Sequence, residues 1–168
     1  MKFPTPYFDI LQREYRADPR SAHICVSGFH SGEPQPPDTS AARMSEALCV
    51  ATGLVSDRAA IADAAERGDG RDVMLGRFGY LADLCAHGMA RSAKDLAYFL
   101  VEHWGRPMEL IRPKEKEAKE LLVDTCGVVA FLGIDGVHVP GHIDVWDRNQ
   151  CKGAAYWGCR KALFWKLD

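Results

Sequence analysis

The chain has 168 residues, of which 47% are hydrophobic and 26% are charged, and its formal net charge is −2. This composition is typical of a soluble globular protein, and the length suits one domain over residues 1–168. The small net charge points to neither nucleic acid nor an anionic membrane as a partner. No apolar run approaches the roughly 20 residues that span a bilayer, and the N-terminus is not a Sec-type signal peptide, so we expect no membrane insertion.

The first three quarters of the chain predict helices. Apolar spacing and capping residues favour helices over residues 6–17, 40–53, 57–67 and 92–105. The clearest is 92–105, where Ser92 stands at the N-cap position and Gly105 closes the helix. Residues 28–38 predict a turn-rich loop, 76–88 are ambiguous, and the charges of 114–122 predict a solvated face.

The last quarter predicts strands. Residues 127–134 have the pattern of a buried strand, 136–147 contain a second strand, and 162–168 contain a third. Helices followed by a run of strands indicate an α+β domain with a small antiparallel sheet.

His142 and Asp144 are the sharpest candidates for chemistry. They are two residues apart in a predicted strand, so their side chains leave the same face. A carboxylate beside an imidazole orients a general base and stabilises its cationic form. The alternative is a polar pair on the exposed face of a strand.

Ser40 stands at the start of a predicted helix, after Pro36 and Pro37. It could be an N-cap, as could Asp38 and Thr39. It could also be a nucleophile, because a helix N-terminus supplies N–H groups and a positive dipole end. Those features help a thiol more than a hydroxyl, whose activation depends mainly on a base.

A metal site is a further alternative. His138, His142 and Asp144 form a credible set of nitrogen and oxygen ligands. Pro140 and Gly141 between the histidines argue against the helix that a zincin motif requires. We therefore expect no metal and no cofactor.

The six cysteines form no CxxC pair, which argues against a zinc knuckle. Four of them stand among apolar residues and are expected to pack as small hydrophobes. Cys151 and Cys159 flank a short segment with glycines that could bring them together, so we expect a disulfide between them.

Three stretches, in order, resemble the fourth family of type VI secretion amidase effectors. They are "DTSAARMSEALCVATG", "RSAKDLAYFLVEHWGRP" and "GHIDVWD", and they extend from residue 38 to residue 147. The resemblance implies a papain-like NlpC-type fold and a peptidoglycan amidase that cuts the stem peptide between D-glutamate and diaminopimelate. It also implies a cognate immunity protein, secretion by the type VI system and action in the target-cell periplasm.

The same resemblance assigns site residues. It puts the family's catalytic cysteine at Ser40 and a general base at His142, with an acid soon after. The later segment "CKGAAYWGC" has no acid, so Asp144 ranks first and Asp147 stays open. A one-atom change in an otherwise intact motif favours a form inactivated by replacing cysteine with serine. A natural serine or degenerate member is the other explanation, and a non-catalytic cell-wall-binding or inhibitory pseudoenzyme is the alternative function.

Overall fold

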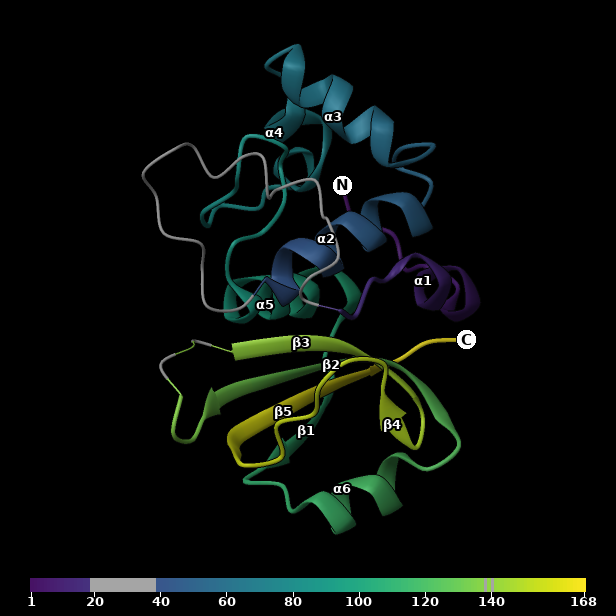
Figure 1. Cartoon of the computed structure of the whole chain (residues 1–168), viewed down its shortest axis with the longest axis vertical. Helices are drawn as coiled ribbons and strands as arrows, with labels where there is room; N and C mark the ends of the chain where they lie inside the picture. The colour runs from purple at the N-terminus through teal and green to yellow at the C-terminus, as the bar shows by residue number, and fades with distance from the viewer. Residues whose placement is uncertain (19–38, 138, 140) are drawn as a thin grey trace.

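A five-stranded antiparallel sheet divides the protein into two layers of unequal size (Figure 1). The computed structural model describes residues 1–18, 39–137, 139 and 141–168. The order of strands across the sheet is β1-β5-β2-β3-β4. Their bounds are Met108–Ile111 for β1, Thr125–Ile134 for β2, Gly141–Arg148 for β3, Gln150–Cys151 for β4 and Cys159–Lys166 for β5.

In the described part of the chain, most of the helices cover one face of the sheet and a short helix covers the other (Figure 1). The larger layer holds α1 (Phe8–Glu14), α2 (Ser40–Ala51), α3 (Arg58–Glu66), α4 (Gly70–Val73), a 3-10 turn at Leu75–Phe78, and α5 (Ala93–Trp104). The opposite face is covered by α6 (Glu115–Leu122). No helix in the described part of the chain is long and apolar enough to cross a membrane.

The predicted elements are present, with shifted ends. Each predicted helix and strand corresponds to an observed one, and Ser92 accepts the N–H of Asp95 as the cap of α5. The sequence did not predict α4, α6, β1 or β4 as such, and the predicted loop at 28–38 lies outside the described residues. The predicted α+β class is confirmed.

Two apolar cores lie on the two faces of the sheet. Alternate residues of β2 and β3, such as Val128, Ile143 and Val145, pack against the larger helical layer. Their neighbours Phe131 and Trp146 pack in the second core on the α6 side. Ala118 and Leu122 of α6 are buried in that core, so the charged helix is more than the solvated face predicted for it.

The outer edge of β3 is covered by side chains where β4 does not pair with it. β4 is bonded only to Trp146 and Asp147. Further along β3, the backbone N–H of Ile143 donates to Ser40 Oγ at 3.1 Å, and the Ile143 carbonyl accepts from Tyr15 Oη at 3.1 Å. Backbone groups that an edge strand leaves unpaired are thereby bonded to α2 and to the end of α1.

The predicted disulfide between Cys151 and Cys159 is wrong, since both are free thiols. Strand register gives the physical reason. Cys151 lies opposite Trp146, which pairs with Gly127 of β2, whereas Cys159 pairs with Ile134 at the other end of β2. Seven residues of strand correspond to about 23 Å, far beyond the reach of a disulfide.

Candidate active site

Ser40 is the first residue of α2 and is fully buried. Thr39 occupies the N-cap position, so the N-cap interpretation of Ser40 is wrong. The Ser40 hydroxyl instead accepts the N–H of Ile143, which places the start of α2 against β3, one residue from His142. The helix itself is buried over nearly its whole length, because it lies between the sheet and the remaining helices.

His142 and Asp144 are brought together, as their spacing predicts. His142 Nε2 lies 3.2 Å from Asp144 Oδ2. The His142 side chain is 6% exposed and that of Asp144 is fully buried, so water screens the pair weakly. Because a carboxylate accepts, this contact assigns the proton to Nε2 and leaves Nδ1 as the basic nitrogen of the neutral ring.

Backbone N–H groups hold the Asp144 carboxylate in place. Oδ1 accepts from the N–H of Val145 at 2.7 Å and from that of Gly153 at 3.1 Å. Oδ2 accepts from the N–H of Ala154 at 3.1 Å. The carboxylate therefore accepts hydrogen bonds from both β3 and the loop after β4, and its Oδ2 also contacts His142.

Asp147 is not brought to this site. It lies on the opposite face of β3, since it is three positions after Asp144 in an extended strand and side chains alternate between the faces. Its carboxylate accepts from Gln12 Nε2 at 2.7 Å and from the Cys126 thiol at 3.7 Å. These contacts tie β3 to α1 and leave Asp144 as the acid beside His142.

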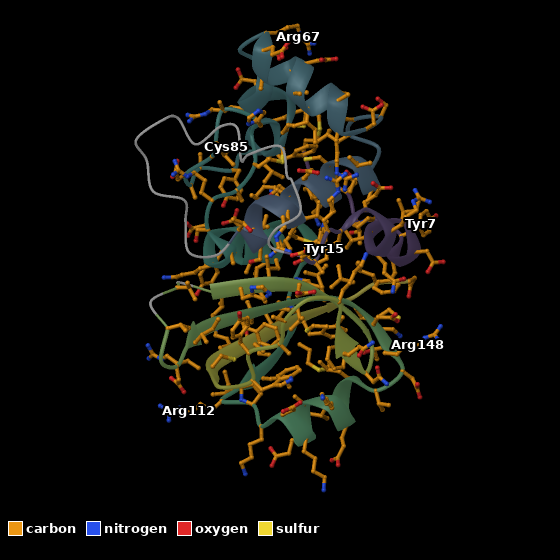
Figure 2. The ribbon with its side chains drawn as sticks, viewed as in Figure 1. Tyr7, Tyr15, Arg67, Cys85, Arg112 and Arg148 are labelled. Atoms are coloured by element: carbon orange, nitrogen blue, oxygen red, sulfur yellow. The ribbon has the colours of Figure 1, made fainter. Side chains whose placement is uncertain are left out.

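Two cations hold the chain after α1 against the site. Arg43, one turn after Ser40, is buried and donates to the carbonyls of Arg16 at 2.7 Å and Ala17 at 2.6 Å. Lys152 Nζ donates to the Tyr15 carbonyl at 2.8 Å, and burial lowers the pKa of this amine. Tyr15 is labelled in Figure 2, between the helices and the sheet.

Aromatic rings surround the imidazole on the α6 side of the sheet. The Tyr156 ring lies 4.8 Å from that of His142 between centroids, and the Phe131 ring lies at 6.4 Å. Trp157 packs edge-on against Phe131 at 5.0 Å. These rings restrict how the imidazole can turn.

Sequence reasoning missed the loop that follows β4. The N–H groups of Gly153 and Ala154 and the ring of Tyr156 all contact the His142–Asp144 pair. The segment carries no acid and no histidine, so only Gly153 indicated a close approach of the backbone to another group.

The metal alternative gains no support from the described residues. Among them, no group of three or more histidine, cysteine, aspartate or glutamate side chains could hold a metal ion. His138, the third member of the candidate set, lies outside the described residues.

Comparison with known proteins identifies the fold. No protein-family model and no curated protein matches the chain. The crystal structure of the type VI effector-immunity complex Tae4-Tai4 from Salmonella Typhimurium matches with a TM-score of 0.64 and 16% identity, covering 98% of this chain and 100% of that chain. Tae4 from Enterobacter cloacae matches at a TM-score of 0.60 and 14% identity, covering 100% of both chains. The chain has the Tae4 fold.

The Tae4 fold agrees with the resemblance found in the sequence and with the predicted papain-like NlpC-type class. Its match extends over nearly the entire chain, well beyond the three stretches that carry the resemblance. In the Salmonella complex, Tae4 is bound to its immunity protein Tai4.

Proposed function

We propose that this chain is a type VI secretion antibacterial effector with the active site of a peptidoglycan cysteine amidase. The observation that carries the proposal is the meeting of a helix N-terminus at Ser40 with the strand that holds the His142–Asp144 pair. The Tae4 fold over the full chain supports it. In its active form the residue at position 40 is a cysteine, and serine makes the present chain nearly inert.

The proposed reaction uses position 40 as nucleophile and His142 as base and acid. Nδ1 of His142 takes the thiol proton, and the thiolate forms a bond to the carbonyl carbon of the scissile amide. The amide C–N bond then breaks, and the imidazolium protonates the leaving amine. Water, activated by the same imidazole, hydrolyses the acyl-enzyme and releases the acid product.

Asp144 is the proposed orienting acid. Its contact with Nε2 fixes the ring tautomer that leaves Nδ1 basic, and its charge stabilises the imidazolium formed during turnover. Backbone N–H groups in the first turn of α2 are the proposed donors to the oxyanion, because a helix leaves its first N–H groups without partners inside the helix.

Serine at position 40 removes the charge that this site is suited to hold. A thiol near a helix N-terminus and an imidazole can exist as thiolate–imidazolium before attack. A hydroxyl begins neutral and must lose its proton during attack. Each 1.36 kcal/mol of added barrier lowers the rate tenfold, so a loss of several kcal/mol leaves little activity.

The proposed substrate is the peptidoglycan stem peptide, cut between D-glutamate and diaminopimelate. The proposed route is type VI delivery into the periplasm of a target cell. A cognate immunity protein is the proposed partner, in parallel with Tai4 in the Tae4 complexes. Ser40 is fully buried, so substrate must displace the atoms that cover it.

Digestion of purified muropeptides tests the proposal. The parent chain, Ser40→Cys and the double variant Ser40→Cys/His142→Ala are incubated with disaccharide tetrapeptide, and products are identified by mass. We expect cleavage between D-glutamate and diaminopimelate by Ser40→Cys alone. No cleavage by Ser40→Cys would contradict the amidase and leave the non-catalytic cell-wall-binding module. Cleavage by the parent at a comparable rate would instead make the chain a serine amidase.

A further inference from the structure

We propose that Gly153 is a positioning residue for His142: the missing side chain at this position gives the Asp144 carboxylate the space in which it contacts the imidazole. The proposal concerns the geometry of the His142–Asp144 pair. Only its catalytic consequence rests on the proposed function.

Space is the reason for glycine at this position. A Cβ on Gly153 would lie 2.5 Å from Asp144 Oδ2, well inside van der Waals contact. The φ angle of Gly153 is not in the left-handed region that several other glycines of the chain adopt, so the backbone itself accepts a side chain. The position therefore excludes a methyl group because the carboxylate is there.

The other neighbours of that methyl group are fixed. The Cβ would also lie 3.3 Å from both the Cβ and the carbonyl oxygen of Ala17. Arg43 holds that carbonyl at 2.6 Å and the preceding one at 2.7 Å. On the loop side, the Lys152 N–H is bonded to the Val145 carbonyl at 2.8 Å. A methyl group between these two restrained backbones is expected to displace the short side chain of Asp144.

Displacing the carboxylate uncouples it from His142. Oδ2, the oxygen that the methyl group would meet, is also the oxygen 3.2 Å from His142 Nε2. A nearby negative charge favours the imidazolium and raises the pKa of the histidine. Gly153→Ala should therefore lower the pKa of His142 with little effect on the fold.

The other polar groups around the pair are shared by parent and variant. The Tyr156 ring packs on the imidazole. The Cys151 thiol and the Lys152 amine interact electrostatically with the Asp144 carboxylate. None of these side chains is changed by the substitution. A difference in the pKa of His142 between the two proteins thus reports the position of the carboxylate.

NMR titration of the imidazole signals tests the proposal on the chain as it stands. His142 is assigned through His142→Gln, and its pKa is compared in the parent, Gly153→Ala, Asp144→Asn and Gly158→Ala. The last is the matched control, since a Cβ at Gly158 meets nothing within 4 Å. We expect a pKa about one pH unit lower in Gly153→Ala and in Asp144→Asn, and an unchanged value in Gly158→Ala.

A double variant separates positioning from a general loss of structure. Shortening the acid in Asp144→Ala removes the atom that the new methyl group would meet. Gly153→Ala should then lower neither the melting temperature nor the pKa of His142 any further. An unchanged pKa in Gly153→Ala, or an equal further drop in the Asp144→Ala background, would overturn the proposal. The pKa of His142 and the melting temperature are both measured without substrate. Failure of this proposal can therefore be distinguished from failure of the proposed amidase activity.

Discussion

Arg43 is expected to be the polar side chain of α2 on which stability depends most. It is buried, and its guanidinium bonds the carbonyls of Arg16 and Ala17 and the hydroxyl of Thr39. Arg43→Met keeps the apolar stem of the side chain and removes the donors, so two carbonyls lose a charged partner.

The expected cost follows from these contacts. A hydrogen bond to a charged group contributes about 1.5–3 kcal/mol, and neighbouring losses do not add fully. We therefore expect Arg43→Met to lower the free energy of unfolding by about 3 kcal/mol. For a chain of this length, that corresponds to a fall in Tm of about 6–12 °C. The free energy of unfolding of Arg43→Lys should lie between those of the parent and of Arg43→Met, because one ammonium group cannot donate to all the partners of the planar guanidinium.

Urea unfolding and calorimetry of the Ser40 chain measure this effect. Arg67→Met is the matched control, since the Arg67 side chain is 61% exposed and pairs loosely with Asp69 at 3.5 Å. The control should change stability by less than about 0.5 kcal/mol. A loss in Arg43→Met no larger than in Arg67→Met would refute the view that Arg43 fixes the chain after α1 against the site.

Three further predictions concern an ion pair and the thiols. Hydrogen bonds from Arg13, and to a smaller extent from Arg58, hold the pKa of the Glu14 carboxyl below its usual range. The ion pairs of Glu14 therefore stabilise the fold at pH values above the pKa of the unfolded carboxyl. This stabilisation is lost as the pH falls through the pKa of the folded carboxyl. Arg58→Met should therefore cost about 2 kcal/mol at pH 7 and clearly less near pH 3 by urea unfolding, whereas an equal cost at both pH values would contradict the linkage. Burial raises the pKa of the Cys49 thiol, so brief alkylation of the native parent at pH 7 should spare Cys49 until urea unfolds the chain, and rapid labelling of Cys49 in the folded protein would contradict this. A non-reducing digest of the parent should release Cys151 and Cys159 on unlinked peptides.

Local patterns predicted much of the fold. The capping pattern of α5, the buried strand β2 and the face shared by His142 and Asp144 all follow from helical or extended periodicity. Each depends on neighbours within a few residues. That Ser40 lies close to the strand of His142 was also predicted, but from the family resemblance, which assigns both residues to one active site although they are far apart in the chain.

What the sequence did not reveal depends on contacts between distant segments. The disulfide prediction failed because the closeness of Cys151 and Cys159 in the chain says nothing of strand register, which places them at opposite ends of β2. Ser40 was open to interpretation as a cap because its bond to Ile143 spans 103 residues. The role of Gly153 has the same origin, since its need for space comes from Asp144, a side chain of strand β3 nine residues away in the chain.

Trapping of the acyl-enzyme tests most directly the central claim that position 40 is the nucleophile of an amidase. Ser40→Cys is mixed with muropeptide, quenched in acid within a turnover, digested and mapped by mass spectrometry. We predict an adduct with the mass of the acyl fragment that ends in D-glutamate, on the peptide that contains position 40. The same adduct should be missing from the parent chain and from Ser40→Cys/His142→Ala. Hydrolysis by Ser40→Cys with the adduct on another residue, or with the same rate after His142→Ala, would contradict the account.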